Sequence, residues 1–173
     1  AVHDSSKDTT TSESTTETTT TANVVSSGTY NIGTANTGAN DCIEKEANVA
    51  NIDYALSDIA ENSGPISLEE TFQNIVLMVN KANENNVEAI LCSVLPANNF
   101  YWNPKIQPIK KIMQLNQMIK AYSLINQIKY VDYYTEMIDE NLGLDTKYSD
   151  DGVHPNLDGY LKMKTILEFY MKL

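Results

Sequence analysis

The segment "YSDDGVHP", residues 148–155, carries the side chains in this sequence best suited to proton transfer. It holds His154, and an imidazole with an unperturbed pKa of about 6.5 suits the work of a general base. Asp151 lies three residues earlier, across Gly152, so its carboxylate can reach the far ring nitrogen and hold the tautomer. The alternative interpretation is an aspartate that only caps the next helix, beside an incidental histidine.

The spacing of apolar residues predicts the elements that must position this segment. Ser67 followed by Glu70 is a capping box and predicts a helix over 67–84. The nearly continuous apolar run 87–95 predicts a strand buried on both faces. Further elements are expected as a helix after residue 108, a strand over 128–133, a short helix over about 135–141 ended by Gly143, and a last helix from about 156.

This alternation of helices and strands predicts an α/β fold, with a parallel sheet covered by helices on both faces. Ligands bind such sheets outside the carboxyl ends of the strands. The aromatic loop that follows the first strand, with Phe100, Tyr101 and Trp102, belongs on that edge together with residues 148–155. These rings either line an acyl or sugar pocket or cover the edge of the sheet.

The N-terminal part of the chain differs in composition from the rest. Thirteen of the seventeen residues 5–21 are Ser or Thr and the other four are charged, which predicts a disordered tail over 1–22. The remaining 23–173 are expected to form one α/β domain, in which 22–56 are atypical and its first strands incomplete. A chain that opens without Met favours an exported, secreted or cell-surface protein.

Composition argues against several other functions. The net charge is −11 and all twelve basic residues are lysines without a basic run, so nucleic-acid binding is not expected. The longest aliphatic run, 75–79, is too short to span a membrane. The sequence lacks the paired His or Cys spacing of a zinc site and the Gly-rich motifs of nucleotide sites, so no metal and no cofactor are expected.

The segment "YSDDGVHPNLDGY" resembles the final conserved block of the SGNH, or GDSL-type, esterases and lipases, whose signature is D-x-x-H followed by Pro. The segments "SDIAENSGPISLEETFQNIVLMV", "ILCSVLPANNFYWNP" and "YVDYYTEM" resemble its bacterial acetyl-esterase-like branch, so the likeness covers about 57–173. It implies a flavodoxin-like three-layer α/β/α fold and ester hydrolysis through an acyl-enzyme. His154 would then be the general base and Asp151 its orienting carboxylate.

The nucleophile of that family is not evident, because its N-terminal G-D-S block does not occur here. Ser26 and Ser27 in "VVSSGTY" are the nearest candidates, and Ser57 is a third. The family's G-x-N-D block falls on 55–58, where Asp58 is retained and Ser57 replaces the asparagine. That asparagine donates a hydrogen bond to the oxyanion, and loss of such a donor typically costs on the order of a hundredfold in rate.

Two hypotheses follow. The first is an SGNH-type hydrolase of small acyl esters such as acetyl esters, with esters of carbohydrate among the candidates. The second is a truncated or inactive relative that binds carbohydrate or a protein partner through the same pocket. A serine hydroxyl within hydrogen-bonding reach of His154 would favour the enzyme.

Overall fold

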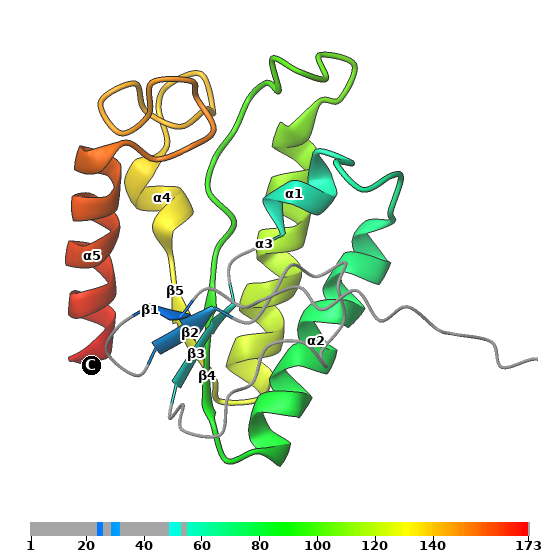
Figure 1. The fold of residues 1–173 in the computed structure, drawn as a ribbon, viewed down its shortest axis with the longest axis vertical. Helices are drawn as coiled ribbons and strands as arrows, with labels where there is room; N and C mark the ends of the chain where they lie inside the picture. Colours follow the sequence, from blue (N-terminus) through cyan, green and yellow to red (C-terminus); the bar gives the residue numbers. More distant parts are fainter. Residues whose placement is uncertain (1–23, 26–28, 32–48, 53–54, 173) are drawn as a thin grey trace, which may run out of the picture.

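The computed structural model describes residues 24–25, 29–31, 49–52 and 55–172. Over these ranges the chain forms a five-stranded sheet in the order β1-β2-β3-β4-β5, with helices packed on it (Figure 1). The strands are β1 Val24–Val25, β2 Thr29–Asn31, β3 Val49–Ile52, β4 Glu88–Cys92 and β5 Lys129–Val131. The helices are α1 Leu56–Ile59, α2 Leu68–Glu84, α3 Pro108–Ile125, α4 Tyr133–Met137 and α5 Leu157–Met171.

The sheet confirms the predicted α/β class. Strands β2 to β5 pair in parallel, and the two-residue β1 adds an antiparallel pair with β2. The predicted tail of residues 1–22 lies outside the described residues. Of the segment 22–56, which the sequence marks as atypical, the structure describes β1 to β3 and the residues 55–56.

Helices cover both faces of the sheet, as predicted. Figure 1 shows α2 and α3 on one side and α5 on the other. Successive residues of β4 point to opposite faces, so Leu91 packs in the cluster with α2 and α3 while Ile90 packs in the cluster with α4 and α5. Two apolar cores on either side of one sheet make the three-layer arrangement.

Local signals set the starts of the long helices. The Ser67 hydroxyl accepts a hydrogen bond from the Glu70 N–H at 3.1 Å, so α2 begins where the capping box predicts. Asn156 caps α5 in the same manner, because its side-chain oxygen accepts the Gly159 N–H at 3.0 Å. This cap joins the loop of residues 148–155 directly to a helix end.

The short helix differs from its prediction over 135–141. Helix α4 starts earlier, at Tyr133, because the Asp132 carboxylate accepts the Thr135 N–H at 3.0 Å. It ends at Met137, so Gly143 does not end it. A Cβ at Gly143 would instead meet the Asn98 side chain, whose Nδ2 would lie 2.6 Å away. This glycine therefore lets two loops at the carboxyl edge approach each other.

The predicted strand over 87–95 ends earlier, at Cys92, because a side chain takes over the pairing. The buried Asn116 of α3 accepts the Val94 N–H at 2.7 Å and donates to the Val94 carbonyl at 3.0 Å. These two bonds satisfy both backbone groups of a buried residue. They also fix the direction in which the chain leaves β4 for the aromatic loop.

Replacement of Asn116 by alanine is expected to lower the free energy of unfolding by about 2 kcal/mol, because it leaves a buried N–H and C=O unpaired. Guanidinium denaturation followed by circular dichroism would measure this loss. Gln117→Ala, at the adjacent and exposed position of α3, is the matched control and should change stability by under about 0.5 kcal/mol. Equal stability of the two variants would contradict the role of Asn116.

Candidate active site

The Asp151 and His154 side chains meet in the loop between α4 and α5. Asp151 Oδ2 lies 2.7 Å from His154 Nδ1. The other oxygen, Oδ1, accepts the backbone N–H groups of Val153 at 2.9 Å and His154 at 2.8 Å. The carboxylate is therefore fixed by the loop that carries the imidazole, and it fixes the orientation of the ring in turn.

Opposing effects act on the Asp151 carboxyl. Partial burial acts to raise its pKa, but hydrogen bonds from the His154 ring and from the backbone of His154 and Val153 outweigh burial. Together they hold the pKa of Asp151 well below its usual range. The carboxylate therefore stays ionised at neutral pH and can stabilise an imidazolium.

The backbone of this loop is held by a serine that sequence reasoning missed. The buried Ser149 hydroxyl accepts the Gly152 N–H at 2.9 Å and donates to the His154 carbonyl at 2.8 Å. Gly152 has a φ of +77°, which a side chain would strain. A serine three residues before a glycine in a turn is the sequence signal that could have predicted these two hydrogen bonds.

The aromatic loop lies beside the imidazole. Phe100 is fully buried, which favours for this ring the alternative of covering the sheet edge, whereas Trp102 is 39% and Tyr101 62% exposed. The Trp102 ring stacks on Phe100 at 5.2 Å and on His154 at 6.1 Å, with an angle of 28° to the imidazole plane. The indole therefore lies over one face of the imidazole.

The position of the family's third block is also at this edge, on α1. The half-buried Ser57 hydroxyl accepts a hydrogen bond from Asn62 Nδ2 at 3.3 Å. Asp58 is buried, and its Oδ2 has no hydrogen-bond partner in the described part of the chain. Burial raises the pKa of Asp58; a hydrogen bond from Thr71 opposes this rise and the charge of Glu70 adds to it.

Comparison with protein families decides the assignment of the chain. The model of the GDSL-like Lipase/Acylhydrolase family matches residues 13–162. The chain belongs to this family. The resemblance that the sequence motifs indicate is thereby confirmed, and the dyad of Asp151 and His154 lies in the last of the blocks that carry it.

Solved structures of GDSL-family proteins are similar to this chain. A Bacteroides fragilis NCTC 9343 protein assigned as an acylhydrolase is 41% identical with a TM-score of 0.70, and a GDSL-like lipase from Bacteroides thetaiotaomicron VPI-5482 is 38% identical with 0.69. Each match covers 73% of this chain, and the chain spans 62% of the length of each relative. No match was found among curated proteins.

A more distant structure shows the fold alone. It is a mutant of Axe2, an acetyl-xylooligosaccharide esterase from Geobacillus, at 13% identity and a TM-score of 0.60. The match covers 78% of this chain and 64% of the other. The same sheet and helix layers therefore extend to proteins of very different sequence.

The GDSL-family nucleophile stays a prediction for this chain. Ser26 and Ser27 lie outside the described residues. Within the described part, the His154 ring is hydrogen-bonded through Nδ1 alone, and the Ser57 hydroxyl is bonded to Asn62. The His154 side chain is 69% exposed, so its second ring nitrogen is open to a nucleophile and a substrate.

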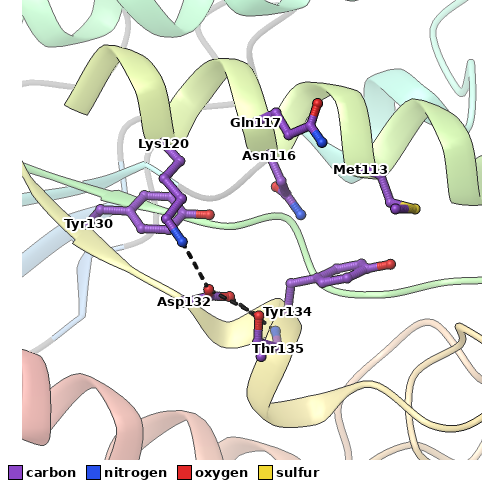
Figure 2. A pocket seen from close by; sticks show the side chains of 8 residues that line it. All are labelled: Met113, Asn116, Gln117, Lys120, Tyr130, Asp132, Tyr134 and Thr135. Atoms are coloured by element: carbon purple, nitrogen blue, oxygen red, sulfur yellow. Dashed lines mark hydrogen bonds and ion pairs between the residues drawn. The ribbon is translucent and has the colours of Figure 1, made fainter. Parts of the chain in front are cut away.

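A pocket of about 170 Å³ lies between α3, β5 and α4 (Figure 2). In it Lys120 Nζ lies 3.8 Å from Asp132 Oδ2, and this carboxylate also caps α4. The lining residues are Met113, Asn116, Gln117, Lys120, Tyr130, Asp132, Tyr134 and Thr135. They include neither Asp151 nor His154, so this pocket and the dyad are separate features of the described structure.

Two further features concern the described residues only. They contain no grouping of three or more His, Cys, Asp or Glu side chains that could hold a metal ion. None of their helices combines the length and apolar character needed to cross a membrane. The candidate site is thus built from a dyad, aromatic rings and the α1 segment.

Replacement of Asp58 by asparagine should stabilise the fold at neutral pH. Because its pKa is raised in the folded state, Asp58 favours folding below its unfolded pKa of 3.8 and loses this contribution as pH rises through the folded pKa. The free energy of unfolding of Asp58→Asn should therefore equal that of the wild type near pH 3.5 and exceed it by about 1 kcal/mol at pH 7. Denaturant unfolding at both pH values is the measurement, and a variant less stable at pH 7 would contradict it.

Proposed function

We propose that this protein hydrolyses carboxylic esters with His154 as general base and Asp151 as its orienting carboxylate. The observation that carries the proposal is the 2.7 Å contact between Asp151 Oδ2 and His154 Nδ1 in a chain of the GDSL-like family. The position of the dyad, in a loop at the carboxyl edge of a parallel sheet, also supports it (Figure 1).

In the proposed reaction, a serine oxygen attacks the ester carbonyl carbon while the second nitrogen of His154 takes the hydroxyl proton. The tetrahedral intermediate collapses, the bond to the alcohol breaks, and the leaving alcohol receives the proton from His154. Water then attacks the acyl-enzyme by the same route, which releases the acid and restores the serine. Asp151 stabilises the imidazolium in both halves of the cycle.

Ser26 and Ser27 are the proposed nucleophiles because they precede Gly28 and follow β1. Ser57 is the third candidate. Its position in the third block suits an oxyanion donor equally well, since its hydroxyl oxygen accepts from Asn62 and its proton is free to be donated. Under this proposal Ser57 takes the place of an asparagine, so stabilisation of the oxyanion is weaker than a side-chain amide would give.

Small acyl esters, acetyl esters of carbohydrate among them, are the proposed substrates. The Tyr101 ring is 62% exposed, and it meets the Trp102 ring, which lies beside the imidazole, edge to face at 4.7 Å. Exposed aromatic faces of this kind stack on the apolar faces of sugar rings. We accordingly propose the exposed Tyr101 ring, with Trp102 beside it, as the sugar-binding rim, and an exported protein as the form that meets such substrates.

Labelling with a fluorophosphonate tests the proposal and identifies the nucleophile. The reagent bonds to an activated serine oxygen, so mass spectrometry of peptides should locate one modification, at Ser26, Ser27 or Ser57. His154→Ala should abolish the labelling because the serine then lacks its base. An unlabelled wild type that also fails to hydrolyse p-nitrophenyl acetate would sink the proposal and favour an inactive binding relative, the alternative that the substitution at Ser57 supports.

A further inference from the structure

The Asn62 side chain connects two segments of the candidate site. Its Oδ1 accepts the indole N–H of Trp102 at 3.0 Å, and its Nδ2 donates to the Ser57 hydroxyl at 3.3 Å. The indole nitrogen can only donate, so the acceptor it faces must be the amide oxygen, which directs the amide nitrogen to Ser57. One amide thus joins α1 to the loop after β4.

Asn62 sits on a turn that is itself held in place. Its N–H donates to the Ser57 carbonyl at 3.2 Å, and the Gly64 N–H donates to the Glu61 carbonyl at 3.1 Å. Glu61 adopts a φ of +56°, and its carboxylate pairs with Lys111 Nζ of α3 at 2.9 Å. The amide of Asn62 is therefore presented from a braced turn, although its side chain is exposed.

The indole that Asn62 holds is one ring in a stack of three. The buried Phe100 lies at one end, Trp102 in the middle and the exposed imidazole of His154 at the other end. The indole covers one side of a ring that Asp151 holds at its edge. A hydrogen bond that fixes the rotation of the indole therefore also limits how the imidazole can turn.

We propose that Asn62 is a positioning residue for His154, which it orients by holding the Trp102 indole against the imidazole. The inference rests on the proposed function, in which His154 must present its second nitrogen to a serine. Ser57, the second partner of Asn62, lies in the block that faces the oxyanion in this family. Asn62 accordingly fixes the base and the α1 position relative to each other, a long-range link that no local motif encodes.

Tryptophan fluorescence tests this contact without any need for catalysis, because Trp102 is the only tryptophan in the chain. A protonated imidazole in contact with an indole quenches its emission, so wild-type fluorescence should fall on acidification. His154→Gln should remove this fall, and any response left in that variant reports other charged groups, such as Asp151 at the imidazole and the Glu61–Lys111 pair next to Asn62. Asn62→Ala should reduce the His154-dependent fall by about half or more, since the indole is then free to rotate.

Asn126→Ala is the matched control. Asn126 is an exposed asparagine with one side-chain hydrogen bond, at the C-cap of α3. Figure 1 shows that this end of α3 points away from the loop between α4 and α5. Asn126→Ala should leave the quenching unchanged. Equal quenching in Asn62→Ala and wild type would overturn the proposal.

Kinetics on p-nitrophenyl acetate provide the second arm. Asn62→Ala should lower kcat by about three- to tenfold with little change in KM, because it misplaces the base and leaves the binding of a small ester intact. Trp102→Phe keeps an aromatic ring, although a smaller one, and removes the N–H. If Asn62 acts through Trp102, the double variant Asn62→Ala/Trp102→Phe should lose no more than the larger single loss. If the losses in kcat of the two single variants added up in the double variant, Asn62 would not act through Trp102, and the proposal would be overturned. A wild type without turnover but with the expected quenching would sink the proposed function while supporting the positioning role.

Discussion

Replacement of His154 by alanine is expected to lower kcat/KM for p-nitrophenyl acetate by about a thousandfold or more. The exposed ring is the one group in the described loop that can take a proton from an alcohol near neutral pH, and Asp151 already holds its Nδ1 at 2.7 Å. Without the ring, the serine keeps its proton and attacks as a weak nucleophile. Steady-state rates of the purified variants measure the loss.

His3→Ala is the control for this change, because His3 is the other of the two histidines in the chain and lies in the predicted tail of residues 1–22. It should retain the wild-type rate. Asp151→Asn should cost about a hundredfold or more, since a neutral amide keeps the backbone contacts and removes the charge that stabilises the imidazolium. If His154→Ala and the wild type turned over at the same rate, His154 would not be the base.

Much of the fold can be predicted from the sequence because its signals are local. The capping box at Ser67 and the apolar run at 87–95 depend on neighbours a few residues away, and both reappear as α2 and β4. Boundaries fail where a distant partner decides them. The apolar run continues past Cys92, but pairing ends there because Asn116, 22 residues beyond Val94, takes over the backbone bonds.

The same distinction between local and long-range contacts applies to the candidate site. Asp151 and His154 are three residues apart, so their contact can be argued from spacing alone, and the structure brings them together. The contact between Asn62 and Trp102 joins residues 40 positions apart, and no local sequence pattern predicts it. Ser149 is an intermediate case. Its hydrogen bonds are to nearby residues, but serines are so common in loops that its residue type alone does not predict them. Local pattern thus predicts the contact of Asp151 with His154, whereas the contact of Asn62 with Trp102 is visible only in the folded structure.

The close approach of the loop of residues 148–155 to α5 predicts a large stability effect at Gly159. This residue is buried in the first turn of the helix, and a Cβ there would clash with the Tyr148 carbonyl oxygen and lie 3.0 Å from Pro155 Cβ. The same carbonyl accepts the Asn156 N–H at 2.9 Å. An added methyl group must therefore push the start of the loop away from the helix that anchors it.

Gly159→Ala should lower the free energy of unfolding by about 3 kcal/mol, because the backbone clash outweighs the gain of about 1 kcal/mol in helix propensity. Guanidinium unfolding followed by circular dichroism measures this, with the exposed neighbour Tyr160→Ala as control at under about 0.5 kcal/mol. The displaced loop carries Asp151 and His154, so kcat of the folded fraction should fall as well. If Gly159→Ala were more stable than the wild type and had the same kcat, the loop would be able to accommodate the methyl group. The geometry of Asp151 and His154 would then depend only on the hydrogen bonds within the loop.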